Sequence, residues 1–176
     1  DRENIKNWLA KSLIKRIFSS EVDNTLRMMR NIIKENTGEF PINTIIDEFR
    51  GKSKTIVFTD EDIENLLYTK YGSAHTFSIL QMLYPTFDFR NKFHIDHIHP
   101  KSLFTTNKLR RLEIGEDEIE AYKDNVNNLG NLQLLDGQLN IEKNDKEFNL
   151  WIMQEFSDTN RRNDYMQKHY IPNVDL

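Results

Sequence analysis

Three of the chain's five histidines, His94, His97 and His99, fall within six residues, and Asp96 lies among them. A lone histidine is usually structural, but three histidines with a carboxylate, directly before Pro100, are not easily explained by packing. A neutral imidazole accepts a proton near neutral pH, and a carboxylate oxygen binds a hard divalent cation. These residue types therefore predict a hydrolytic site that combines a general base with a metal ion.

A second polar segment lies downstream of this cluster. Asn131 opens a predicted short strand, and Asn140 follows nine residues later, at the start of a predicted helix. With Asp96 and His97 on the strand before them, the order along the chain is that of a strand–strand–helix metal site. We expect Asp96 and Asn140 to be metal ligands. Asn131 is expected to hold the His97 ring in its productive tautomer.

Hydrolysis of a phosphodiester would use these groups well. The attacking water must lose a proton, which suits His97 as general base. The phosphoryl and leaving oxygens gather negative charge, which suits one divalent metal acting as a Lewis acid. Carboxylate and amide oxygens favour Mg²⁺ or Mn²⁺ over zinc. The predicted chemistry is therefore metal-dependent phosphodiester cleavage.

Four further residues are candidates for accessory roles. His94 is two residues from Asp96, so it shares a strand face with it and should lie nearer the site than His99. Lys101 and Lys143 are candidates for phosphate contacts because they are close to the site in sequence. An ordinary exposed surface lysine is an equally good interpretation of each.

The sequence pattern along the chain predicts an α+β fold that is mostly helical, with an embedded ββα-metal unit that carries these groups. Residues 1–86 have helical spacing almost throughout, apart from a short strand predicted at 55–58. Residues 87–156 form the predicted core, with strands at 89–98 and 132–135 and an insertion at about 103–126. A C-terminal helix and tail occupy residues 157–176.

Composition limits the alternatives. The chain has no cysteine, which removes disulfides and thiolate zinc sites. No apolar run approaches the roughly 20 residues needed to span a bilayer, so no membrane role is expected. The net charge of −4 argues against a strong non-specific clamp on DNA. The chain opens with Asp1, and we interpret it as a piece of a longer protein.

At the residues of the candidate site the sequence resembles the HNH endonuclease superfamily. Asp96-His97-Ile98-x-Pro100, with Asn131 and Asn140, resembles the HNH core of the CRISPR effector nuclease. The closer likeness is to the C-terminal nuclease domain of GmrSD-type, modification-dependent restriction enzymes. That family has a His-x-x-Pro motif followed by a segment like the Asn-Leu-Gly-Asn-Leu-Gln-Leu-Leu that begins at Asn128 here.

The resemblance implies antiviral cleavage of DNA in the cytoplasm of a bacterium or archaeon. It implies an upstream nucleotide-hydrolysing sensor domain that recognises modified phage DNA. It also implies the same roles for His97, Asp96, Asn131 and Asn140 as the residue types predict.

Two other classes of function stay open. A zinc hydrolase could use the three clustered histidines and Asp96, although their order, His-x-Asp-His-x-His, differs from the metallo-β-lactamase-like His-x-His-x-Asp-His. A non-catalytic DNA-binding or assembly module with a degenerate site would fit the acidic balance. The intact Asp96, His97, Asn131 and Asn140 argue against such a module, and the wrong order and the scarcity of further histidines argue against the zinc hydrolase.

Overall fold

Helices predominate in the computed structural model, which describes residues 1–172, and two short strands form one antiparallel sheet. The expected α+β, mostly helical fold is confirmed, with 57% of the structure helical. The helices are α1 (Arg2–Ile14), α2 (Val22–Glu35), α3 (Ile42–Phe49), α4 (Asp60–Leu67), α5 (Thr76–Leu83), α6 (Thr106–Arg111), α7 (Glu116–Asn125), α8 (Gly137–Lys143), α9 (Phe148–Glu155) and α10 (Thr159–Lys168). The strands are β1 (Phe93–His97) and β2 (Leu132–Asp136), and single 3₁₀ turns occupy Lys101–Leu103 and Leu129–Asn131.

Local side-chain caps explain where several helices begin. Thr59 accepts a hydrogen bond from the Asp62 backbone N–H (3.1 Å), and the Asp62 carboxylate accepts one in return from the Thr59 N–H (2.8 Å). This reciprocal pair is a capping box and starts α4. Simpler caps start two other helices: a side-chain oxygen of Asp136 accepts from the Gln138 N–H at the start of α8, and one of Asp158 accepts from the Arg161 N–H at the start of α10.

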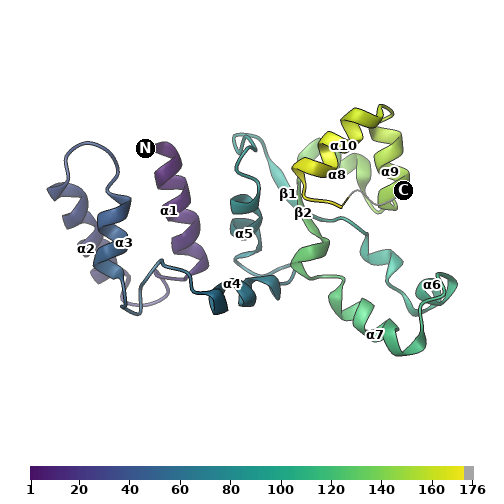
Figure 1. Ribbon diagram of the computed structural model, residues 1–176, viewed down its shortest axis with the longest axis horizontal. Coiled ribbons are helices and arrows are strands. Elements are labelled where there is room, and N and C mark those ends of the chain that lie inside the picture. Colours follow the sequence, from purple (N-terminus) through teal and green to yellow (C-terminus); the bar gives the residue numbers. More distant parts are fainter. Residues whose placement is uncertain (173–176) are drawn as a thin grey trace.

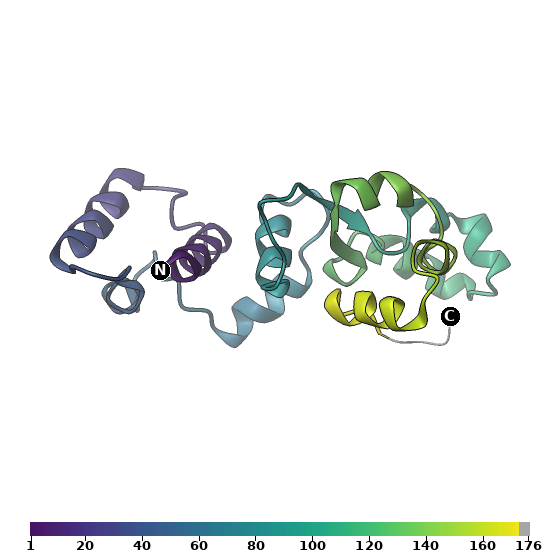
Figure 2. The same ribbon diagram turned by 90° about the horizontal axis from the view of Figure 1, so that it is seen from above.

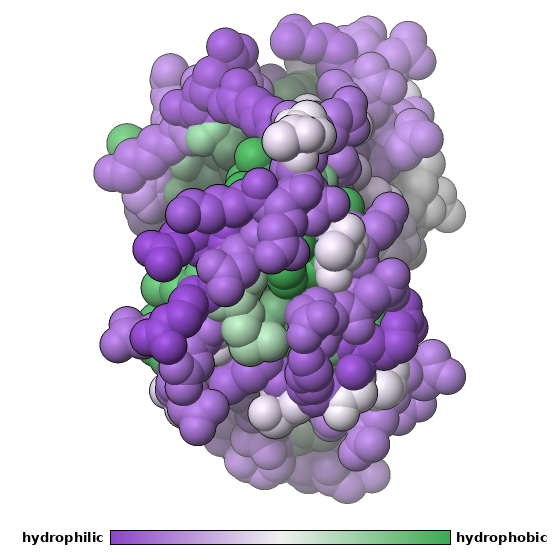
Figure 3. All heavy atoms as spheres, turned by 90° about the vertical axis from the view of Figure 1, so that its left-hand side faces the viewer, coloured by the Kyte–Doolittle hydropathy of each residue, from purple (hydrophilic) through white to green (hydrophobic). Residues whose placement is uncertain are grey.

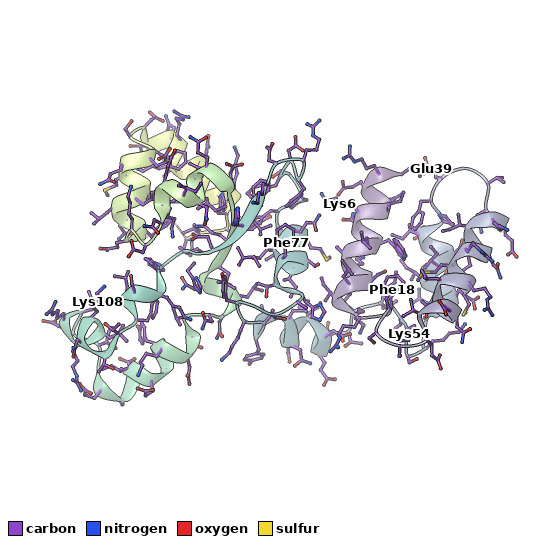
Figure 4. The ribbon with its side chains drawn as sticks, turned by 180° about the vertical axis from the view of Figure 1, so that it is seen from behind. Lys6, Phe18, Glu39, Lys54, Phe77 and Lys108 are labelled. Atoms are coloured by element: carbon purple, nitrogen blue, oxygen red, sulfur yellow. The ribbon has the colours of Figure 1, made fainter. Side chains whose placement is uncertain are left out.

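A first hydrophobic cluster holds α1, α2 and α3 together at one end of the elongated molecule (Figures 1 and 2). Its buried side chains are Ile17, Met29, Ile32, Ile45, Phe49 and Ile56. Phe18 lies between α1 and the pair α2 and α3 (Figure 4). The outer face of this end is mostly hydrophilic, with hydrophobic side chains showing between the polar ones (Figure 3).

A second cluster joins the helical part to the sheet. Ile14 of α1 meets Ile79, Leu80 and Tyr84 around α5, and these pack against Leu134 of β2. Lys6 and Phe77 lie in the space between α1 and α5 (Figure 4). The helices of residues 1–86 thus share buried apolar surface with the strands that carry the candidate site. The division of the chain at residue 86 stays a prediction.

A third cluster covers the other side of the sheet. Leu135 of β2 and Ile98 meet the helices α9 and α10 through Phe148, Trp151 and Tyr165. α6 and α7 occupy the predicted insertion and extend away from this cluster (Figure 1). β1 and β2 therefore run through the middle of the molecule, with helices on both sides of them.

Two of the expected strands need correction. Residues 55–58 contain no strand: Ile56 is buried in the first cluster, but no neighbouring strand is available to pair with the segment. The strand expected at 89–98 is shorter, because Asp88 accepts hydrogen bonds from the backbone and guanidinium of Arg90 and so forms a turn before β1 begins. Residues 173–176 of the predicted tail lie outside the described residues. None of the helices described within residues 1–172 has the length and apolar character of a membrane span.

Candidate functional site

The candidate site is built on a strand–strand–helix unit. β1 pairs with β2 in antiparallel register, with Asp96 opposite Gln133 and His97 opposite Leu132. α8 follows β2 without a loop, because the Asp136 carboxylate accepts a hydrogen bond from the Gln138 N–H (3.0 Å). The order of these elements agrees with the ββα unit that the sequence predicted.

α8 lies against β1 and runs in the same direction. At its start, the Gly137 N–H donates to the Lys92 carbonyl (3.0 Å), and a Cβ on Gly137 would lie 3.7 Å from the His94 ring. At its end, Lys143 Nζ donates to the His97 carbonyl (2.6 Å). Asn140 is three residues from both Gly137 and Lys143, so it shares the helix face that meets β1.

The Asp96 carboxylate is held by two neighbours. Its Oδ2 accepts a hydrogen bond from Gln133 Nε2 (3.0 Å) and pairs with Lys143 Nζ at 2.9 Å. The Lys143 side chain is 0% exposed and that of Asp96 is 11% exposed. A buried ammonium needs such a partner, because an unpaired charge in the interior is strongly destabilising.

This pair continues into the protein through a buried network. Gln133 is 0% exposed, and its Oε1 accepts a hydrogen bond from Tyr165 Oη (2.6 Å). Burial, with the nearby charge of Asp96, raises the pKa of Tyr165 well above its usual value of 10.0. The phenol therefore stays protonated and keeps donating to Gln133, which in turn orients its amide N–H toward Asp96.

The His97 ring has different neighbours. Its Nε2 lies 3.0 Å from Asn127 Oδ1, and the ring centroid lies 4.7 Å from that of Tyr71 at an interplanar angle of 36°. Because an amide oxygen only accepts, Nε2 carries the proton and Nδ1 is the basic nitrogen of the neutral ring. The side chains of His97 and Asp96 are successive on β1 and so point to opposite faces of the strand.

Asn131 does not make the predicted bond to the His97 ring. Its Oδ1 accepts from the His99 N–H (2.8 Å), and its Nδ2 donates to the carbonyls of His99 (3.0 Å) and Val126 (2.9 Å). Its own carbonyl accepts from the Ile98 N–H (2.8 Å). Asn131 therefore fastens the chain that leaves β1, and in this structure Asn127 takes the place expected of it beside the ring.

The other predicted residues lie around this unit. His94 is partly buried on the Asp96 side of β1, beside Gly137. His99 is exposed, its ring centroid 5.9 Å from that of Phe148. Although the residue as a whole is exposed, neighbouring atoms desolvate part of its ring, which lowers the pKa of His99; the charge of Lys143 lowers it further, against the opposing effect of Glu147.

The two lysines have contrasting positions. Lys101 is exposed in the 3₁₀ turn after Pro100 and remains available for a phosphate contact. Lys143 is completely buried, so its expected contact with a phosphate is corrected to an ion pair with Asp96. Closeness to the site in sequence does not distinguish an exposed lysine from one that is buried and paired.

The donor set on the α8 side of β1 suits a hard divalent cation. Asp96 offers a carboxylate whose Oδ1 has no hydrogen bond among the described residues, and Asn140 offers an amide oxygen from the facing helix. Within residues 1–172, no three histidine or acidic side chains come together as a metal site.

Asn127, Tyr71, Gln133 and Tyr165 were missed by sequence reasoning. None of the four was singled out from the sequence. The partners of these residues lie 26 to 37 positions away in sequence, as in Tyr71 with His97 and Gln133 with Asp96. No periodic pattern reports a contact at such a distance.

Comparison with known proteins gave one family. A family model described as GmrSD restriction endonucleases, C-terminal domain, matches residues 43–173. The matched segment contains the whole of the ββα unit together with Tyr71 and Asn127. No curated protein matched the chain.

Proposed function

The chain belongs to the family of GmrSD restriction endonuclease C-terminal domains, and from this premise we propose that it is an HNH-type endonuclease domain that hydrolyses DNA phosphodiesters with one divalent metal. The observation that carries the proposal is the ββα unit. His97 ends β1, and its Nδ1 has no hydrogen bond among the described residues; Asp96 contacts α8 through Lys143, and Asn140 lies on α8 between Gly137 and Lys143, which both contact β1 or the residue before it.

His97 is the proposed general base. The Nε2 proton is donated to Asn127 Oδ1, which leaves Nδ1 as the proton acceptor for an attacking water. Since His97 is the last residue of β1, a phosphodiester laid across this end of the strand would be within reach of both strand faces. The base would then act from one face while the oxygen donors act from the other.

Asp96 and Asn140 are the residues proposed to hold a metal, with His94 beside them. When bound, Mg²⁺ or Mn²⁺ would supply Lewis-acid stabilisation of the charge that gathers on the phosphoryl and leaving oxygens. Asn131 supports the site indirectly: by fastening residues 98 and 99, it holds the end of β1 where His97 stands.

DNA is the proposed substrate because the family is one of restriction endonucleases. The net charge of −4 fits an effector with low intrinsic affinity for DNA. We therefore propose that an upstream nucleotide-hydrolysing sensor domain recognises modified phage DNA and brings this domain to it. This system would operate in the cytoplasm of a bacterium or archaeon.

One observation favours a second candidate, a domain that is inactive in isolation. Lys143 already neutralises Asp96 from within the protein, at 2.9 Å. A cation that approaches Asp96 must compete with this ammonium for the carboxylate charge. On this alternative the domain would bind or assemble on DNA and would cleave only after its partner has rearranged the pair.

Incubation of the chain with supercoiled plasmid distinguishes the two candidates. The nuclease predicts nicking or linearisation with Mg²⁺ or Mn²⁺ that EDTA abolishes. An absence of cleavage with either metal, while the chain remains folded, would favour the second candidate.

A further inference from the structure

Tyr71 lies outside the ββα unit, yet its ring packs against His97. It belongs to the loop between α4 and α5, and its ring centroid is 4.7 Å from that of His97. The side chain is 48% exposed, so one part of the ring faces solvent while another covers the imidazole. A half-exposed tyrosine contributes less to the core than a buried one, so packing of the core alone does not account for the position of Tyr71 beside His97.

The loop that carries Tyr71 is fastened at several points. The Tyr71 N–H donates to the Asn127 carbonyl (2.7 Å), and Lys70 forms an isolated β-bridge with Asn128. The hydroxyl of Thr76, which is 0% exposed, donates to the carbonyls of Lys70 (2.8 Å) and Ser73 (3.1 Å). The position of Tyr71 is thus determined by backbone contacts and by a buried hydroxyl, independently of its own ring.

Asn127 closes a three-residue arrangement. Its backbone carbonyl binds the Tyr71 N–H, and its side-chain Oδ1 binds His97 Nε2. A single hydrogen bond to Nε2 still allows the imidazole to tilt about that bond. The ring of Tyr71, tilted 36° against the imidazole, blocks the tilt on one side, so that the bond and the ring contact together restrict the orientation of Nδ1.

We propose that Tyr71 is a positioning residue for His97, which makes the α4–α5 loop of the helical part a component of the cleavage site. The proposal rests on the proposed role of His97 as general base. Tyr71 touches neither water nor phosphate in this role; it acts by holding the imidazole so that Nδ1 is presented at the end of β1. A general base that is misplaced by about 1 Å can lose on the order of 100-fold in rate.

Nuclear magnetic resonance of the histidine rings in the full chain tests the contact directly. The ring current of Tyr71 should shift the His97 ring protons, and a single tautomer should appear in the ¹⁵N spectrum, with the proton on Nε2. In Tyr71→Ala we expect the ring-current shift to vanish and the two tautomers to mix. Tyr71→Phe keeps the ring and should preserve both signatures.

Tyr68→Ala is the matched control, since Tyr68 lies at the C-terminal end of α4, three residues before Tyr71, is 74% exposed and has no aromatic contact among the described residues. Unchanged His97 resonances in Tyr71→Ala would overturn the proposal. Because the spectra do not depend on cleavage, this test stands even for a chain that proves inactive.

Cleavage rates distinguish the positioning role of Tyr71 from the nuclease activity itself. We expect Tyr71→Ala to lose about 10-fold to 100-fold in rate, and Tyr71→Phe to stay within about twofold of the unmodified chain. Full activity of Tyr71→Ala would contradict positioning while leaving the nuclease intact. Cleavage by His97→Ala at the unmodified rate would instead contradict the proposed function. Should Tyr71→Ala unfold, Tyr71→Leu keeps apolar bulk without the aromatic face and is expected to show the same loss.

Discussion

The ammonium of Lys143 lies 2.9 Å from Oδ2 of Asp96, with both side chains withdrawn from solvent. The same ammonium donates to the carbonyl of His97 at 2.6 Å. One buried lysine on α8 therefore touches two successive residues of β1, a proposed metal ligand and the proposed general base. Its charge balances the carboxylate, and its hydrogen bond fixes the end of the strand.

Replacing Lys143 by methionine should destabilise the chain and make it more responsive to metal. The change leaves a buried carboxylate without its counter-ion, at a cost of about 3–5 kcal/mol. A divalent cation that binds Asp96 would restore that charge balance, so Mn²⁺ should raise the melting temperature of Lys143→Met by more than that of the unmodified chain. Thermal melts with and without Mn²⁺ measure both effects.

Lys146→Met is the control for this change, because Lys146 is an exposed lysine three residues further along the same segment. It should melt like the unmodified chain and gain nothing extra from Mn²⁺. An equal response to Mn²⁺ in Lys143→Met and Lys146→Met would argue that metal binds elsewhere than at Asp96.

Asn131→Ala tests the observed role of this asparagine. The substitution removes three side-chain hydrogen bonds to the backbone of His99 and Val126. We expect a loss of about 2 kcal/mol in the free energy of unfolding, measured with urea. Asn107→Ala, at an exposed position of α6 with no side-chain hydrogen bond among the described residues, should leave stability nearly unchanged. Equal stability of the two variants would contradict the fastening role.

His169 should make stability depend on pH. Burial lowers its pKa from 6.5 to about 4, with a smaller contribution from Lys168. Between these two values the unfolded chain binds a proton that the folded chain does not, so stability is complete above 6.5 and falls as the pH drops toward 4. The loss between about pH 7.5 and about pH 5 should be on the order of 2 kcal/mol.

The variant His169→Phe isolates this effect. It keeps an aromatic ring beside Tyr84 and Tyr165 but cannot titrate. Urea unfolding at the two pH values should show a clearly flatter dependence for His169→Phe. The same slope in both chains would mean that other groups account for it.

The sequence predicted the ββα order because its signals are local. Alternating residues before Pro100 indicate β1, and the apolar run at 132–135 indicates β2. Residues 55–58 have the composition of a strand, but composition does not say whether a second strand is there to pair with them, and no strand within residues 1–172 does so.

The contacts inside the site required the structure. His97 and Asn127 are 30 residues apart, and Lys143 and His97 are 46 apart. The sequence predicted an asparagine beside the ring and favoured Asn131, which was expected to open the facing strand; in the structure Asn131 ends the 3₁₀ turn before β2. In the structure the Asn131 side chain bonds to the backbone and the Asn127 side chain bonds to the ring. The fold of the loop before β2 decides which asparagine reaches the ring, and no local pattern in the sequence indicates that fold.

The most direct test of the central claim is plasmid cleavage by His97→Ala in the presence of Mn²⁺, beside His75→Ala as a matched control. His75 lies at the start of α5 and has no side-chain hydrogen bond among the described residues. Loss of the base should lower the rate by a factor on the order of 100 to 10,000, while His75→Ala should cleave like the unmodified chain. A His97→Ala chain that is folded and cuts at the unmodified rate would contradict the account.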